Sequence, residues 1–398
     1  MQRTPHHCAL CGRSVKDRPW LDSPIATLGL VAVAYAVFLG VQLSRNGFDF
    51  SVFVTAGDRF VDPAAAPDHL HVMQDSAGYD GQFCYRLALT PFTRERSALG
   101  VTLDDPAYRQ QRIVYPLLGW ALSFGQPGPV PVSLVLVNLA ALFAIGILGS
   151  RYAQQSHLPA VWGLVFALYP GFLLVLSRDT VEIVEICFLL GAVVCLRQNR
   201  YWVATALLVL AVLTKETALV VAVGILLALP MDYDRKQIRT SLSLAAAPIL
   251  AYALWQTWLN YTWSRSPVNE TAIRANIGMP FVGLSLFVRS ILPPTNHFQW
   301  VWLVELLLLL CFVVAVVFVL RQSATSRHIK GSWLLYLALS ITLTRAVWVE
   351  DWAFLRVLSE LYVLGIMILL DSRSRLKEWV FYATMVSWLL LGLRAIIG

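Results

Sequence analysis

The chain has 398 residues, of which 58% are hydrophobic and only 14% are charged, and its formal net charge is +7. Soluble domains are about half apolar and about a quarter charged. The composition therefore excludes an ordinary soluble globular domain and favours a membrane protein with several spans. In such a protein the distribution of the positive charge over the loops is more informative than its total.

The first 24 residues are polar and contain a CxxC motif, Cys8 and Cys11, beside His6 and His7. Four such side chains at this spacing can bind zinc. An ordinary tail with incidental cysteines fits equally, because no second CxxC follows. We expect residues 1–24 to form a cytoplasmic tail and residues 25–398 to form the membrane domain, whose first apolar stretch is an uncleaved spanning helix.

Eleven apolar stretches follow one another between charged or proline-rich breaks, at 25–43, 130–149, 158–177, 180–196, 201–213, 217–230, 241–261, 300–320, 333–349, 353–370 and 378–397. A spanning helix needs about 20 apolar residues. Stretches 201–213 and 217–230 are short, which suits a hairpin whose tip, at Thr214 to Glu216, dips into the bilayer. Stretch 113–125 is broken by Pro116 and is expected to be interfacial or re-entrant. We predict an all-α polytopic bundle of about 11 transmembrane helices.

Charge in the connecting segments gives an orientation. With the N-terminus in the cytoplasm and eleven spans, the cytoplasmic segments hold 16 Lys and Arg residues against 6 Asp and Glu residues, a net of +10, and the opposite side has a net of −3. Short basic loops lie on the cytoplasmic side of membrane proteins. The two long connections, 44–112 and 262–299, then lie outside the cytoplasm, where long loops of compact proteins are often functional.

The first long loop combines acidic, aromatic and amide side chains. Tyr79, Asp80 and Gln82 surround a glycine, and the pair Asp104 and Asp105 follows. An aspartate held at the membrane edge can act as a general base. The same Asp-Gly pair is also ordinary turn chemistry, so both interpretations stay open for Asp80.

Basic residues recur at the outer ends of the predicted spans. Arg109 and Arg112 share one face of a helix and form a fork that suits a phosphate. They equally fit interfacial arginines that extend toward lipid headgroups. Further ionisable candidates are Arg178, Asp179, Glu182, Lys215, Glu216, Arg345 and Arg356. Charges at membrane depth are costly unless they are paired or face water, so these residues are expected to line a site or to pair with one another.

Four stretches of the sequence resemble the GT-C glycosyltransferases, multi-span enzymes that use polyprenyl-phosphate sugars and include the mannosyltransferases of GPI-anchor assembly. The resemblance rests on Tyr79 to Phe83, Tyr108 to Leu117, Leu213 to Glu216, and Phe354 to Leu358. It implies a GT-C-like bundle in the plasma membrane of a bacterium, and a sugar, possibly mannose, transferred from a polyprenyl phosphate to a lipid, glycan or protein hydroxyl.

The resemblance also implies roles for individual residues. Asp80 would be the base, and Arg112, Lys215 and Arg356 would neutralise the leaving phosphate, with Arg109 beside them. Many such enzymes carry adjacent acids in the first loop, and here the pair Asp104–Asp105 lies further on. Which acid is the base, and whether a divalent cation takes part, stays open on this basis.

Sequence motifs and repeats bear on other classes of function. Walker, Rossmann, HExxH and GxSxG patterns are absent from the sequence, and we expect no nucleic-acid partner. A transporter or flippase for a lipid-linked or small anionic substrate would also place buried charges along a path. Transporters usually show inverted repeats, which this sequence lacks. We expect a transferase, with the transporter as the alternative.

Overall fold

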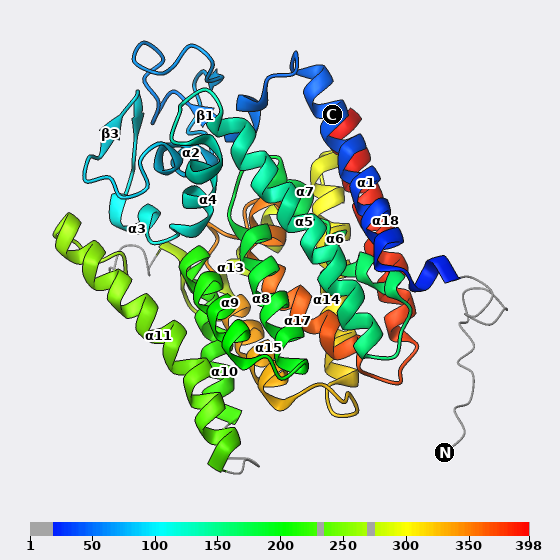
Figure 1. Ribbon diagram of the computed structural model, residues 1–398. Helices are drawn as coiled ribbons and strands as arrows, with labels where there is room; N and C mark the ends of the chain where they lie inside the picture. Colours follow the sequence, from blue (N-terminus) through cyan, green and yellow to red (C-terminus); the bar gives the residue numbers. More distant parts are fainter. Residues whose placement is uncertain (1–18, 229–234, 269–274, 398) are drawn as a thin grey trace, which may run out of the picture.

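The computed structural model describes residues 19–228, 235–268 and 275–397 (Figure 1). The expected cytoplasmic tail with Cys8 and Cys11 lies almost entirely outside the described residues. Within them the protein is all-α, apart from two sheets of two short strands each. The first sheet pairs β1 (Ala56–Gly57) in parallel with β2 (Val72–Met73), and the second pairs β3 (Ser97–Ala98) antiparallel with β4 (Val101–Thr102).

The helices of the first half begin with η2 (Pro19–Asp22) and α1 (Pro24–Arg45). Ser23 caps α1 by accepting a hydrogen bond from the Ala26 amide, and Pro24 fits the first helical position. The elements that follow are η3 (Phe50–Val54), α2 (Gly81–Leu89), α3 (Pro106–Gln110), α4 (Val114–Ser123), α5 (Val130–Gln155), η4 (Ala160–Gly163), α6 (Leu164–Ala167), α7 (Gly171–Leu176), α8 (Glu182–Arg197) and α9 (Tyr201–Thr214).

The second half of the described chain is also helical. Its elements are η5 (Glu216–Ala218), α10 (Leu219–Ala228), α11 (Arg235–Trp263), α13 (Val282–Ile291), α14 (His297–Val319), α15 (Arg327–Ile341), α16 (Asp351–Val357), α17 (Ser359–Leu370) and α18 (Leu376–Ile397). Figure 1 shows α18 beside α1, so that the two ends of the membrane domain meet, and shows the first-loop elements gathered at one end of the bundle. Helix α17 is buried along its whole length.

Four of the described helices are long and apolar enough to cross a membrane: α1, α5, α11 from Ser241 onward, and α14. The bent pair α16–α17 makes a fifth if it is counted as one span. These helices make the protein polytopic, as the composition indicates. Helices α4, α9, α10 and α13 are apolar but shorter than a span.

Three of the predicted stretches are interrupted. Stretch 158–177 is divided into η4, α6 and α7. Pro170, which has no amide hydrogen to donate, precedes α7. At Gly163 a Cβ atom would lie only 2.5 Å from the Ser150 amide, so that this segment packs directly on the backbone of α5. The stretch therefore consists of three short helical segments and not of one continuous helix.

The other two interruptions lie in the last third. Helix α15 ends at Ile341, because the following residues hydrogen-bond to 276–281 instead, with Gly278 N to Thr342 O at 2.7 Å. Stretch 353–370 bends by 52° between α16 and α17. There the Leu355 carbonyl accepts a hydrogen bond from the Tyr169 hydroxyl at 2.5 Å. This bend directs the end of α16 toward the first loop.

Candidate active site

Asp80 lies at the point where three distant parts of the chain meet. It occupies the position before α2 that an aspartate normally uses to cap a helix, but its carboxylate makes no capping hydrogen bond. Its Oδ1 accepts from Arg109 Nη1 and its Oδ2 accepts from Arg356 Nη1, both at 2.7 Å. The carboxylate, 25% exposed, is therefore held between α3 and α16.

Close backbone packing fixes the position of Asp80. At Gly81 a Cβ atom would lie 2.3 Å from the Arg178 carbonyl, so only glycine fits there. The buried Gln82 accepts from the Gly57 amide at 3.1 Å and donates to the Ala77 carbonyl at 2.9 Å. Gln82, a candidate from the sequence, thus anchors the first loop and does not line the cleft described below.

The two guanidinium groups decide the charge of Asp80. Burial alone would raise its pKa, but the charges of Arg109 and Arg356 outweigh burial and hold the pKa of Asp80 well below its ordinary value. Asp80 is therefore ionised at every physiological pH.

Arg109 links Asp80 to Asp104. Its Nε and Nη2 donate to the two oxygens of Asp104 at 2.8 and 2.7 Å, and its guanidinium lies 4.2 Å from the centre of the Phe83 ring. Burial would raise the pKa of Asp104, but the hydrogen bond and charge of Arg109 lower it. Asp105 caps α3 by accepting from the Tyr108 amide at 3.3 Å. The carboxylate of Asp104 thus binds a guanidinium that also binds Asp80.

Arg112 joins the first loop to the break between α9 and α10. It donates to both oxygens of Glu216, from Nε at 2.9 Å and from Nη2 at 2.5 Å. Its Nη2 also reaches the Tyr108 hydroxyl at 3.2 Å. The chain can make this contact because Lys215 is extended, with φ −153° and ψ 127°, and interrupts the helix there. The break predicted at 214–216 is confirmed.

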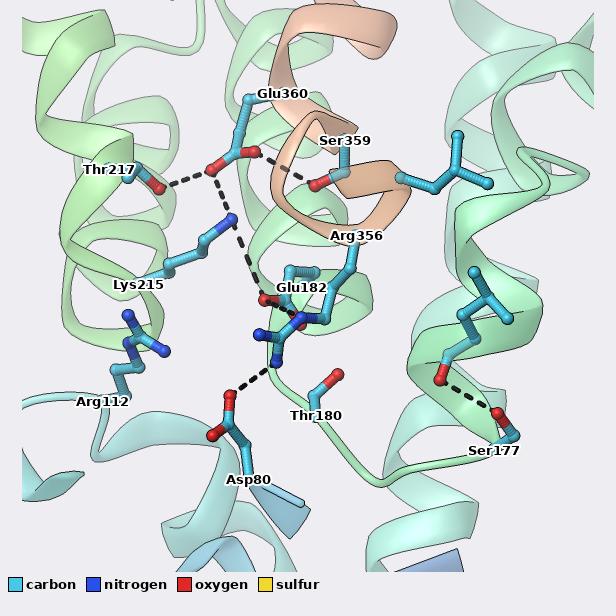
Figure 2. A network of polar contacts seen from close by, with 12 residues as sticks. Asp80, Arg112, Ser177, Thr180, Glu182, Lys215, Thr217, Arg356, Ser359 and Glu360 are labelled. Carbon is cyan, nitrogen blue, oxygen red and sulfur yellow. Dashed lines mark hydrogen bonds and ion pairs between the residues drawn. The ribbon is translucent and has the colours of Figure 1, made fainter. Parts of the chain in front are cut away.

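A chain of alternating charges runs from Asp80 into the bundle (Figure 2). Arg356 Nε lies 3.5 Å from Glu182 Oε1, and the same oxygen lies 3.9 Å from Lys215 Nζ. Lys215 donates to Glu360 Oε1 at 2.8 Å. The side chains of Lys215, Glu182 and Glu360 are almost fully buried.

Arg178 lies near Tyr79, outside this chain of ion pairs. Its guanidinium carbon is 3.8 Å from the centre of the Trp352 ring and 5.5 Å from that of Tyr79, whose ring is also 5.0 Å from Arg356. The connection that carries Arg178 also carries Asp179, which is buried and accepts from the Tyr115 hydroxyl at 3.4 Å. Asp179 therefore supports the fold beside the site.

The charged residues border a narrow cleft with a cavity volume of about 20 Å³. Its lining comprises Asp80, Phe83, Cys84, Leu87, Tyr108, Arg109, Arg112, Thr180, Val181 and Arg356. Such a mixture of convergent polar groups and apolar walls is typical of a small-molecule site. The base and three of the four cations expected from the sequence line this one cleft or donate to residues in it.

The structure also separates some candidates from the site. Arg345 is exposed and makes no ion pair within the described part of the chain. Glu360, by contrast, belongs to the charge chain but was missed. Its signal was an acid inside an apolar stretch, four residues after Arg356 and hence on the same helical side. In 19–228, 235–268 and 275–397, no three His, Cys, Asp or Glu side chains converge as metal ligands would.

Fold and site together define a polytopic membrane protein with a charged cleft at one end of its bundle. The model of glycosyltransferase family 87 matches residues 114–344, more than half of the chain. The chain therefore belongs to glycosyltransferase family 87, a family of GT-C membrane glycosyltransferases. No curated protein matches it.

Family membership decides between the two classes of function left open by the sequence. The protein is a glycosyltransferase, and the transporter alternative is set aside. The matched region contains Arg178, Glu182, Lys215 and Glu216. Asp80, Arg109 and Arg112 precede it and Arg356 follows it, so the roles of these four are argued from geometry.

Proposed function

We propose that this glycosyltransferase moves a hexose, with mannose the first candidate, from a polyprenyl-phosphate donor to an acceptor hydroxyl, with Asp80 as the base. The observation that supports this best is the placement of Asp80, a single ionised carboxylate in a cleft beside three arginines. Carboxylate and cations are the two kinds of group that the reaction needs, one to receive a proton and the others to stabilise a leaving phosphate.

The proposed step is an inverting displacement. Asp80 takes the proton of the acceptor hydroxyl, and the acceptor oxygen forms a bond to the anomeric carbon of the sugar. The bond from that carbon to the phosphate oxygen breaks, and its electron pair stays on the polyprenyl phosphate. The proton on Asp80 then leaves to the phosphate or to water. No redox partner is needed.

Asp80 must gain basicity for this step. A carboxylate held by two guanidinium groups binds a proton weakly. A donor phosphate that draws Arg109 or Arg356 toward itself would loosen one of the two 2.7 Å contacts. The pKa of Asp80 would then rise when the donor binds, and the base would become active in the complex.

We also propose the topology in which this chemistry takes place. The eleven-span arrangement with a cytoplasmic N-terminus puts loop 44–112, and with it Asp80, on the outer side of a bacterial plasma membrane. Loop charge supports this orientation. Residues 25–398 then act as one membrane domain, in which loop 262–299 is the second large outer connection.

The donor class can be tested with the purified full-length protein in nanodiscs. We expect release of polyprenyl phosphate when a polyprenyl-phosphate hexose is supplied with a hydroxyl acceptor, and no turnover with nucleotide sugars. A panel of radiolabelled donors, one per sugar, measures this directly. Transfer from a nucleotide sugar in the absence of any lipid donor would contradict the proposed donor.

The Arg109–Asp80 contact gives a pH prediction. Arg109→Gln removes one of the cations that lower the pKa of Asp80, so that this pKa rises toward its ordinary value of about 4. Because the carboxylate of the variant then takes up a proton at higher pH, the acidic limb of the kcat/KM profile should move up by roughly 1 to 2 pH units.

The matched control is Asp104→Asn, which frees Arg109 from its other partner and leaves its 2.7 Å contact with Asp80 available. We expect no upward movement of the acidic limb in this control. Superimposable profiles for Arg109→Gln and the unsubstituted enzyme would mean that Asp80 is not the titrating group.

A further inference from the structure

Arg178 does not itself line the cleft but lies two residues before Thr180, which does, and within the described ranges it has no carboxylate oxygen within 4 Å. Among the described residues, Arg109, Arg112, Lys215 and Arg356 each lie within 4 Å of at least one carboxylate oxygen. Arg178 has no such contact, and its one side-chain hydrogen bond goes from Nη1 to the Ser177 hydroxyl at 2.8 Å. Four of these five cations are thus occupied by the protein itself, and one is free to bind an anion.

Aromatic rings hold Arg178 in place without neutralising it. The guanidinium lies against the face of Trp352, 3.8 Å from the ring centre, and the centre of the Tyr79 ring is 5.5 Å away. Arginine stacks on aromatic faces while its N–H groups still point outward in the ring plane. Its backbone is also fixed, since the Arg178 carbonyl packs directly on Gly81. The side chain is therefore preorganised, and its remaining N–H groups are available.

An unpaired cation in this position is energetically costly. Removing a charge from water without a counter-ion carries a large penalty. Burial lowers the pKa of Arg178, and the nearby charge of Arg356 lowers it further, while Tyr79, Asp351 and Glu350 act in the opposite direction. Of these, Asp351 is already bound by Arg394 and Trp302. A bound anion would remove the penalty.

The place of Arg178 indicates which anion this is. The guanidinium carbons of Arg178 and Arg356 both lie within 5.5 Å of the centre of the Tyr79 ring, and Tyr79 is the residue before Asp80. A phosphate held by Arg178 would be close to Arg356 and to the proposed base. Guanidinium groups bind phosphate in bidentate fashion, which fixes orientation as well as charge.

We propose that Arg178, supported by Trp352, is the primary phosphate-binding residue of the site and grips the phosphate of the lipid donor before Arg356 does. This inference rests on the proposed function in one respect, that the phosphate is that of a polyprenyl donor. It changes the roles expected from the sequence, in which Arg112 and Lys215 contacted the phosphate. Those two residues hold protein carboxylates, and Arg178 receives the substrate.

The test uses the full-length protein in nanodiscs and polyprenyl phosphate as the probe. Arg178→Gln should weaken binding of polyprenyl phosphate by at least about tenfold, as loss of a charged hydrogen bond does. It should raise the donor KM by a similar factor while leaving the acceptor KM unchanged. Arg178→Lys should recover part of the affinity, because it keeps the charge but loses the planar fork. Affinity equal to that of the unsubstituted protein in Arg178→Gln would overturn the proposal.

Two controls separate this result from misfolding. Arg289→Gln removes an exposed arginine that does not line the cleft and contacts no residue of the charge chain, and it should leave donor KM unchanged. The melting temperature of Arg178→Gln should be the same as that of the unsubstituted protein or higher, because the substitution removes an unpaired charge. A fall in melting temperature together with unchanged KM values would make Arg178 structural and overturn the proposal.

The experiment also keeps the two proposals distinct. Asp80→Asn should bind polyprenyl phosphate but not transfer sugar, so a failure of Asp80 as base leaves the Arg178 result intact. Inorganic phosphate and a nucleotide hexose are tested as competitors in parallel. If either binds through Arg178 as tightly as polyprenyl phosphate, the phosphate site stands and the lipid donor fails.

Discussion

Asp80→Asn is expected to lower the rate of sugar transfer by about 10²- to 10⁴-fold, the usual range for loss of a general base. Asparagine has the same shape, and its amide oxygen can still accept from one of the two arginines, while its NH2 group faces the other. It cannot take up the proton of an acceptor hydroxyl. The loss should therefore appear in kcat for every donor and acceptor tested, measured as release of labelled sugar from saturating donor.

The control for this variant is Asp68→Asn, which changes an exposed aspartate of the same loop. It should retain full activity. The two proteins should also insert and elute from size-exclusion chromatography alike, because Asp80 is at the edge of the bundle. Unchanged turnover by Asp80→Asn would remove Asp80 from the chemical step. The next candidate for the base would then be Asp104, which is linked to Asp80 through Arg109.

Lys215→Met is expected to cost about 3–5 kcal/mol of folding free energy, the range for breaking a buried ion pair from one side. Glu360 contacts the ammonium at 2.8 Å and Glu182 lies 3.9 Å away, and both are almost fully buried. The substitution leaves these carboxylates without their cation. The measurement is thermal unfolding in detergent, where the melting temperature should fall by several degrees.

A second variant distinguishes a structural lysine from a phosphate ligand. Lys215→Met combined with Glu360→Gln removes one orphaned carboxylate as well and should recover much of the lost stability. The role implied by the family resemblance, direct contact with the donor phosphate, leads to a different result. In that case Lys215→Met would keep its melting temperature and lose donor affinity alone, and the double variant would gain nothing.

Much of the architecture could be predicted from the sequence because apolar stretches and loop charge report directly on membrane insertion. The all-α polytopic class and the break at Lys215 follow from local composition. The first loop could be chosen as the site region because Asp80, Arg109 and Arg112 occur there without a simple structural purpose. Each of these signals lies within a few residues of the sequence.

The pairing of the charges could not be predicted, because it depends on contacts between distant segments. Nothing near Arg112 indicates Glu216 as its partner, 104 residues later. Nothing near Lys215 indicates Glu360, 145 residues later. The role of Gln82 could not be predicted either. Its neighbours in the sequence do not distinguish a buried amide that anchors the backbone from an exposed amide that binds substrate. At the bend before Ser359, the Leu355 carbonyl accepts a hydrogen bond from the Tyr169 hydroxyl, which again lies far away in the chain.

The ion pair between Asp80 and Arg356 joins residues 276 positions apart, and this separation bears on biosynthesis. A ribosome adds about 5–20 residues per second, so many seconds pass between synthesis of the first loop and synthesis of α16, which carries Arg356. During that interval Asp80 and, later, Lys215 have no native counter-charge from the unfinished helices. A chain released before α16 would leave Asp80 with Arg109 alone, and one released before α17 would also leave Lys215 without Glu360. The charge pairs of the site are thus completed only when the last third of the chain has been made.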